Sequence, residues 1–369
     1  AAIRTMNYLT EDHVMKLKIA ISLLAAAIVL LVATSCERNG GVYEDELNVL
    51  GSFAQISIAG MLPENAKQAA LAVEKDLLAL DYIGFTFEDE GELLQLNEAI
   101  AQGQGMVVSD GLVELIMEAR KLSAASAGLF NPATGELTAL WEFHCGKEQC
   151  SEVPYPDEVQ RLIDEQVAKI IAGHPSMDDL IIKGNEVSSR NRLVKLEFGD
   201  IIRGLALEKG IAHLEDMEIS NAMIDVGGNV RTMGRRGEHH WWVGIPDASG
   251  KHLLGSIENI DDQAVVTVRA FDQSFGKQDL VYRHIVDPRS GLPVRDVQSV
   301  TVMHDNAMVA NASAMALLVV GIKDWKTVAD GMDVHNILMI TKDGTLYTSL
   351  AMSHIIHWKQ GIEHQYLIP

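Results

Sequence analysis

The sequence is poor in several kinds of residue, and each shortage excludes a class of protein. Its 369 residues include 3 cysteines, too few for a disulfide-stapled scaffold or a four-cysteine zinc site. Basic residues number 30 against 51 acidic ones, so the formal net charge is −21. This balance argues against nucleic-acid binding through a general electrostatic footprint, because phosphate backbones would be repelled. An anionic cofactor remains compatible with it, since helix N-termini and backbone amides can hold a phosphate.

The N-terminal residues 1–36 have the pattern of a secretory signal. Two lysines, Lys16 and Lys18, precede an uncharged run of 17 residues from Ile19 to Ser35. This pattern is typical of the signal segments of exported proteins. The segment Ala33-Thr34-Ser35-Cys36 resembles a bacterial lipobox, which predicts cleavage before Cys36 and lipid attachment to it. The alternative is a plain membrane anchor, for which this run is short.

We therefore expect a signal segment over 1–36, a polar tether over 37–48 and a folded domain over 49–369. The mature chain would be exported and anchored to a membrane, facing the periplasm or the cell exterior. In that compartment Cys145 and Cys150 could form a small disulfide loop, or they could remain a free pair.

Helix and strand patterns are mixed along the rest of the chain. Apolar periodicity predicts helices over 63–80, 109–127, 157–173, 201–214 and 309–320. Alternation predicts strands over 49–58, 222–226, 241–245, 264–268, 281–286, 299–303, 336–341 and 345–349. Turn residues predict hairpins at Gly184-Asn185 and Asp343-Gly344. The elements do not alternate strictly as βαβ, so we expect an α+β fold.

Four glycine-punctuated segments are the candidates for chemistry. They cover residues 127–135, 198–204, 224–230 and 284–293. In the second, a glycine loop enters a helix whose free amides can face an anion, and Arg203 can add charge. In the third, Gly227-Gly228 interrupts a strand, which indicates a bulge or a close backbone approach to a ligand. The fourth places His284 at the end of a strand, beside a turn.

In their order and spacing, these segments resemble the ApbE family, the FAD:protein FMN transferases of exported bacterial lipoproteins. His284-Ile285-Val286-Asp287-Pro288, with Gly291 and Pro293, is similar to the family's His-Ile-Ile-Asp-Pro-x-Thr-Gly-x-Pro. Leu140-Trp141-Glu142-Phe143 resembles its Leu-Trp-Gly-Phe, and Val226-Gly227-Gly228 resembles its central Gly-Gly strand. The likeness covers roughly residues 50–352.

The resemblance implies an ApbE-like, T-fold-related α+β fold of mixed sheets packed with helices, with a flavin cleft between two lobes. It implies that FAD is split at its pyrophosphate, with magnesium, and that FMN passes to a Thr or Ser hydroxyl of a target protein. His284 is then the candidate base, although it could instead hydrogen-bond the Asp287 turn. The implied flavin contacts are Leu50, Phe87, Leu129, Phe130, Asn131, Glu197, Arg203 and Val286, and the implied metal positions are Asp200, Asn311, Ala314 and Met315.

Several of these positions depart from the family pattern. Asn311 stands where the family has a metal-binding Asp, and Met315 stands where it has a Thr. Magnesium prefers oxygen ligands, above all carboxylates, so we expect weakened binding of the ion. The helix could equally be a small-residue packing face. Asp200 occupies a position where the family supplies a backbone oxygen, and its side chain could restore a carboxylate ligand.

Three functions remain open at this point. The first is an active FAD:protein FMN transferase. The second is a flavin-binding lipoprotein, a carrier that is weakened or inactive in catalysis. The third is an FAD pyrophosphatase, in which water replaces the protein hydroxyl and the products are FMN and AMP.

Overall fold

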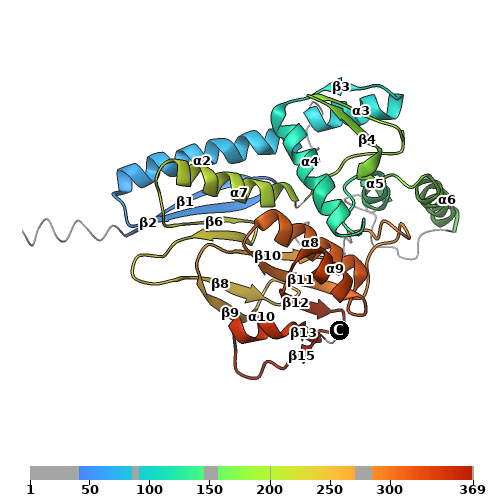
Figure 1. Ribbon diagram of the computed structural model, residues 1–369. Coiled ribbons are helices and arrows are strands. Elements are labelled where there is room, and N and C mark those ends of the chain that lie inside the picture. The colour runs from blue at the N-terminus through green and yellow to red at the C-terminus, as the bar shows by residue number, and fades with distance from the viewer. Residues whose placement is uncertain (1–40, 85–90, 145–156, 200, 271–284, 368–369) are drawn as a thin grey trace, which may run out of the picture.

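A nine-stranded sheet forms the centre of the molecule in the computed structural model, which describes residues 41–84, 91–144, 157–199, 201–270 and 285–367 (Figure 1). Its order is β1-β2-β6-β7-β10-β11-β12-β13-β15, and all neighbours are antiparallel except β13 and β15. The strands are β1 (Val42–Val49), β2 (Ser52–Ala59), β6 (Ala222–Val226), β7 (Asn229–Met233), β10 (Ala264–Arg269), β11 (Val297–His304), β12 (Asn336–Thr341), β13 (Leu346–Thr348) and β15 (Gln365–Tyr366).

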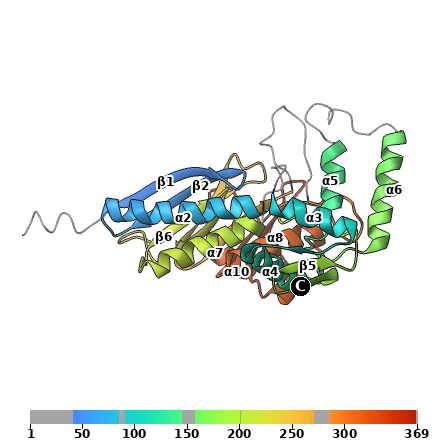
Figure 2. The same ribbon diagram turned by 90° about the horizontal axis from the view of Figure 1, so that it is seen from above.

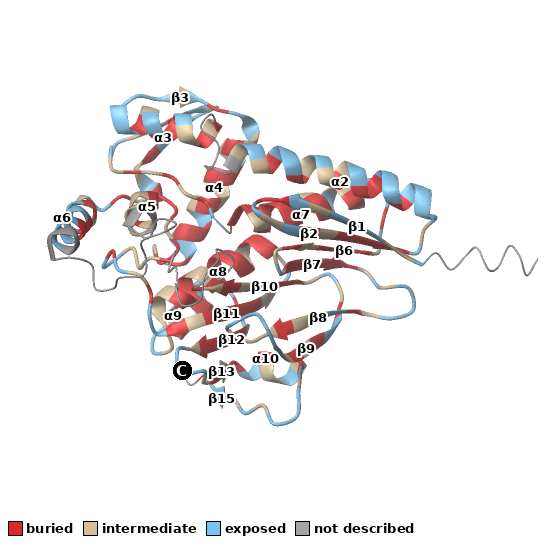
Figure 3. Cartoon of the chain, turned by 180° about the vertical axis from the view of Figure 1, so that it is seen from behind, coloured by how far each residue is buried: buried red, intermediate tan, exposed pale blue. Residues whose placement is uncertain are grey.

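Helices cover one face of this sheet. They are α2 (Pro63–Gly84), α7 (Ile201–Asp216), α8 (Ala307–Val320) and α9 (Trp325–Met332). Figure 3 shows α2 with an exposed outer face above buried strands, as expected for an amphipathic helix on a sheet. Helix α8 is different, because its sequence contains no charged residue and ten of its side chains are buried. It packs on β10 and β11 and against α7 and α9, so it is a core element.

A second, three-stranded sheet covers part of the opposite face. Its order is β14-β9-β8, formed by Ile356–Trp358, Leu253–Ile260 and Trp241–Pro246. Apolar side chains of this sheet, such as Ile245 and Ile257, pack with Leu338 and Ile340 of β12 and with Met352 of α10 (Leu350–Ile355). Two sheets packed face to face with helices outside them agree with the expected α+β class.

The remaining elements form a smaller lobe at the end of the molecule far from the start of β1 (Figures 1 and 2). Its sheet has the order β3-β5-β4, with helices around it. The elements are α3 (Glu92–Gln102), β3 (Met106–Val107), α4 (Asp110–Ala125), α5 (Gly135–His144), α6 (Asp157–Gly173), the 3-10 turn η1 (Met177–Asp179), β4 (Leu180–Lys183) and β5 (Glu186–Ser189).

Local sequence signals explain where several helices begin. The Ser109 side chain caps α4 by accepting a 3.3 Å hydrogen bond from the amide of Leu112, as predicted. The side chain of Asn306 caps α8 in the same way, at the amide of Val309. The predicted apolar face of α4 is buried; it consists of Leu112, Leu115, Ile116, Ala119 and Leu122. The predicted helices at 63, 157, 201 and 309 are likewise present as α2, α6, α7 and α8.

The structure corrects the start of the first predicted strand and of the folded domain. The strand expected over 49–58 is present as β2 from Ser52 onward, whereas Val49 ends β1 and the chain turns at Leu50 and Gly51, both with positive φ. Residues 42–48, which we assigned to the tether, are part of β1. The Gly227-Gly228 pair is not a bulge but the turn between β6 and β7, and a Cβ at Gly227 would lie 2.5 Å from Ser52 Oγ; a close approach of this backbone to a ligand stays a prediction.

Some predictions fall outside the described residues. These concern the signal and the lipobox, the pair Cys145 and Cys150, most of the strand expected over 281–286, and the candidates Phe87, Asp200 and His284. Among the residues that the structure describes, no helix has both the length and the apolar character needed to cross a membrane.

Candidate active site

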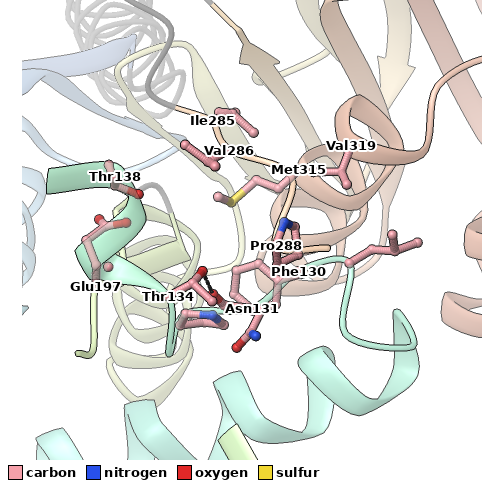
Figure 4. A pocket seen from close by; sticks show the side chains of 13 residues that line it. Phe130, Asn131, Thr134, Thr138, Glu197, Ile285, Val286, Pro288, Met315 and Val319 are labelled. Carbon is pink, nitrogen blue, oxygen red and sulfur yellow. Dashed lines mark hydrogen bonds between the residues drawn. The ribbon is translucent and has the colours of Figure 1, made fainter. Parts of the chain in front are cut away.

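A pocket lies where the two lobes meet (Figure 4). It contains about 460 Å³ of space between atoms, part of it open to solvent. The smaller lobe contributes Leu129, Phe130, Asn131, Pro132, Thr134, Gly135, Thr138 and Glu197; the larger lobe contributes Ile285, Val286, Pro288, Met315 and Val319. The lining is therefore mostly apolar, and Glu197 is the single titratable residue in this described set.

One wall is a loop held rigidly against a neighbouring segment. The amide of Gly135 donates to the carbonyl of Lys195 over 2.9 Å, and the amide of Glu197 donates to the carbonyl of Pro132 over 2.9 Å. A Cβ at Gly135 would lie 2.7 Å from the Cβ of Glu197, so the two segments approach this closely only because residue 135 is glycine.

Asn131 uses its side chain to shape this loop. Its Nδ2 donates to the carbonyl of Pro175 over 2.9 Å, and its Oδ1 accepts from the amide of Ala133 over 3.1 Å. Its own carbonyl accepts from the hydroxyl of Thr134 over 2.8 Å (Figure 4). The side-chain amide of Asn131 thus positions this wall of the pocket.

The opposite wall is the turn that follows His284. The amide of Val294 donates to the carbonyl of Ile285, and the amide of Gly291 donates to the carbonyl of Asp287, over 3.0 and 2.8 Å. The Arg289 guanidinium donates to the Asp287 carboxylate over 2.8 Å, which raises the pKa of Arg289 above its usual value. Backbone hydrogen bonds and the Arg289 side chain thus stabilise this turn from within.

The indole of Trp141 fixes this turn to the smaller lobe. Its Nε1 donates to the carbonyl of Gly291 over 2.9 Å. Gly291 has a φ of +70°, and a Cβ there would collide with Val167 of α6. Val286 packs against the same small apolar cluster as Trp141. The two lobes are thus joined directly beside the pocket, at a position where the backbone requires glycine.

Leu50 and Arg203 meet elsewhere. The guanidinium of Arg203 donates to the carbonyl of Leu50 over 3.3 Å from Nη2 and 3.4 Å from Nε, and the amide of Leu50 donates to Asp81 Oδ1 over 2.9 Å. Leu50 is fully buried, with a φ of +53°. Neither residue is among those that line the pocket. Their role as flavin contacts stays a prediction, and here they fix the start of α7 to the β1–β2 turn.

Helix α8 carries the three candidate metal positions that the structure describes. Met315 and Val319 line the pocket, and Met315 extends into it (Figure 4). Asn311 lies one turn earlier on the same face, because residues four apart stack on a helix. It is 0% exposed, and neither its Oδ1 nor its Nδ2 has a hydrogen-bond partner among the residues that the structure describes. Ala314 is also fully buried.

These residues do not fit a magnesium ion. Asn311 offers one neutral carbonyl and Met315 a soft thioether, whereas magnesium prefers hard oxygen ligands and carboxylates. Helix α8 has no charged residue. Within the described parts of the chain, no three His, Cys, Asp or Glu residues are grouped so that they could hold a metal. Glu197 is the one carboxylate among the described lining residues, and the candidate Asp200 lies outside the described residues.

Sequence reasoning missed several of the lining residues. Thr134, Thr138 and Pro288 were not among the candidates, although Thr134 and Pro288 belong to two of the glycine-punctuated segments. Val319 could have been found from helical spacing, since it lies four residues after Met315. The importance of Gly135 comes from a close approach of two distant segments, which no local pattern indicates.

Comparison with known proteins agrees with this geometry. The model of the ApbE family matches residues 50–338, which include every residue that lines the pocket. The chain belongs to the ApbE family. The matched range runs from the β1–β2 turn to β12 and therefore includes both lobes.

Individual ApbE relatives cover most of the chain. A protein of Rhodobacter capsulatus named FAD:protein FMN transferase is 34% identical over 82% of this chain, which spans 56% of that relative's length. A Vibrio cholerae protein with the same name is 27% identical over 89% of this chain and 96% of its own length. The crystal structure of the ApbE protein from Thermotoga maritima superimposes with a TM-score of 0.71 at 25% identity, over 85% of this chain and 99% of that one.

Proposed function

We propose that this ApbE-family chain is an FAD:protein FMN transferase, an enzyme that moves FMN from FAD to a Thr or Ser hydroxyl of a target protein. The observation that carries the proposal is the pocket. It brings loop 129–135, Glu197 and turn 285–288 together from separate parts of the sequence. Its apolar lining, with Phe130 and Val286 on opposite walls, suits a flat aromatic ring such as that of a flavin.

The reaction is a phosphoryl transfer. The acceptor hydroxyl oxygen forms a bond to the phosphorus of the FMN half, the pyrophosphate P–O bond breaks, and AMP leaves. The hydroxyl proton passes to a base. His284 is our candidate for that base, because it directly precedes Ile285 and Val286, which line the pocket. Magnesium is the family's expected cofactor, and the described residues of α8 provide no ligand set for it.

The proposal is tested with the full chain purified in mild detergent. It is mixed with FAD, magnesium and a domain that carries a flavin-accepting Thr, and the acceptor is then inspected for covalent flavin fluorescence after denaturing electrophoresis. We expect labelling that is lost when the accepting Thr is changed to Ala and reduced at least about a hundredfold in His284→Ala. Failure of the chain to bind or turn over FAD would refute the proposed function.

A second candidate is a flavin-binding protein that no longer transfers FMN. The neutral Asn311 and Met315 on α8 favour it, because a weakened metal site slows chemistry more than binding. Retention of FAD with neither acceptor labelling nor AMP release would identify this function. Release of AMP and FMN without acceptor labelling would instead identify an FAD pyrophosphatase.

We also propose that the chain is exported and held at a membrane by lipid on Cys36, on the strength of the lipobox-like Ala33-Thr34-Ser35-Cys36. Such a lipoprotein would face the periplasm or the cell exterior. Cell fractionation tests this: the chain should be in the membrane fraction, and Cys36→Ala should prevent lipid attachment. An unmodified cysteine in the purified protein would contradict it.

A further inference from the structure

The side chain of Asn311 is the least satisfied polar group beside the pocket. It is 0% exposed, and within the described parts of the chain neither of its amide atoms has a hydrogen-bond partner. Its neighbours Ala310, Ala312 and Ala314 on α8 have no polar side-chain atom, and the buried Ser313 hydroxyl donates to Met332 Sδ instead. Buried amides are normally paired, so an unpaired one beside a ligand pocket calls for a partner that binds there.

The chemistry of the amide indicates what that partner is. A carboxylate only accepts hydrogen bonds, so it meets a phosphate oxygen only through a cation placed between them. A primary amide carries two N–H donors and no charge, and it can therefore donate to a phosphate oxygen directly. With no charged residue on α8, nothing on this helix repels a phosphate or attracts a divalent ion.

Met315, one helical turn after Asn311, lines the pocket, whereas Asn311 does not. Methionine is unbranched, with three rotatable bonds, so it can change rotamer without moving the helix. A change of the Met315 rotamer is therefore the movement that the inference requires for a phosphate group to reach Asn311.

We propose that Asn311 binds a phosphate group of FAD directly through its Nδ2, so that this chain binds FAD without a divalent cation. The inference rests on the proposed function in that FAD is the ligand, and it specifies how the pyrophosphate is recognised. The residues at the family's metal positions would here form a neutral phosphate site.

The test is an FAD titration of the full chain in detergent, followed by flavin fluorescence, without any acceptor protein. Each variant is titrated in buffer with EDTA and in buffer with millimolar magnesium. For the unaltered chain we expect dissociation constants within about twofold of each other in the two buffers. Asn311→Ala removes the donors and should weaken FAD binding about tenfold in both buffers.

Asn311→Asp makes the test sharper, because it restores a carboxylate. FAD binding should weaken at least about tenfold in EDTA, since the new charge faces a phosphate, and magnesium should restore it. Asn306→Asp is the matched control: it makes the same chemical change on the same helix, and Asp retains the cap on Val309. This control should bind FAD like the unaltered chain in both buffers.

Two results would overturn the inference while leaving the proposed function intact. One is FAD binding by the unaltered chain that is about tenfold tighter with magnesium than with EDTA. The other is Asn311→Ala binding FAD as tightly as the unaltered chain. If FAD does not bind in either buffer, the proposed function fails as well. If Asn311→Asp does not fold, the FAD titrations of the unaltered chain and of Asn311→Ala still test the inference.

Discussion

The unpaired amide of Asn311 makes an unusual prediction for stability: shortening this buried side chain should stabilise the protein in the absence of ligand. A buried polar group without a partner costs about 1–3 kcal/mol, and both polar atoms of Asn311 are in this state. Alanine also has the better helix propensity, by roughly half a kcal/mol. Against this, Asn311→Ala leaves a cavity of a few tens of Å³, which costs about 0.5–1 kcal/mol at ~24 cal/mol per Å³.

The balance is a gain of roughly 1–2 kcal/mol in the free energy of unfolding, or about 2–4 °C in melting temperature. Urea denaturation and calorimetry of flavin-free protein in EDTA measure it. Ser313→Ala is the control on the same helix: the Ser313 hydroxyl is also fully buried but donates to Met332 Sδ over 3.3 Å, so this change should destabilise. A loss of 1 kcal/mol or more in Asn311→Ala would show that the amide is satisfied without ligand, and would refute the reasoning.

Three further predictions concern the surroundings of the pocket. In Gly291→Ala the alanine must adopt the positive φ of this position, and its Cβ collides with Val167. The substitution should destabilise the chain by about 1–3 kcal/mol and weaken FAD binding; unimpaired binding would contradict the coupling of this turn to the pocket. Ser109→Ala removes the cap on α4 and should cost about 1 kcal/mol in urea denaturation while leaving FAD affinity unchanged. Burial raises the pKa of Asp225 above the usual 3.8, so the folded state holds this proton more tightly than the unfolded state does. The free energy of unfolding therefore falls as the pH rises from the pKa of the unfolded state to the higher pKa of the folded state. Asp225→Asn should therefore be more stable than the unaltered chain at pH 7 and equal to it at pH 3; equal stability at both would contradict this.

Local sequence signals predicted those helices that have a clear cap residue or a clear apolar pattern. The Ser109 cap and apolar spacing located α4, and the uncharged run over 309–320 located α8. The sequence did not predict strand β1, because acidic residues interrupt its apolar pattern. This strand is at the edge of the sheet, and its Glu44 and Glu46 are exposed. Charged side chains on an edge strand discourage pairing with other molecules. The sequence of such a strand therefore resembles that of a polar linker.

The candidate site was predictable only where one segment carries the information. The residues at 129–131 and at 286 were found because each belongs to a recognisable loop, and the structure places them on one pocket. The contact of Gly135 with Glu197 and the bond from Trp141 to Gly291 join residues far apart in the chain. Such contacts depend on how the lobes pack, which no short window of sequence contains.

The substitutions on α8 explain why fold and family alone do not decide between transfer and binding. The amide of Asn311 has almost the same shape as the carboxylate that the family resemblance predicts at this position, and helix α8 packs between the sheet and α7. Packing responds to volume while metal binding responds to charge, so the fold alone does not show whether this position holds a metal ion. A chain with this helix can keep its likeness to transferases and yet recognise FAD through neutral donors. The dependence of FAD affinity on magnesium, rather than any comparison of folds, separates an enzyme that recruits the ion from a protein that binds the flavin without it.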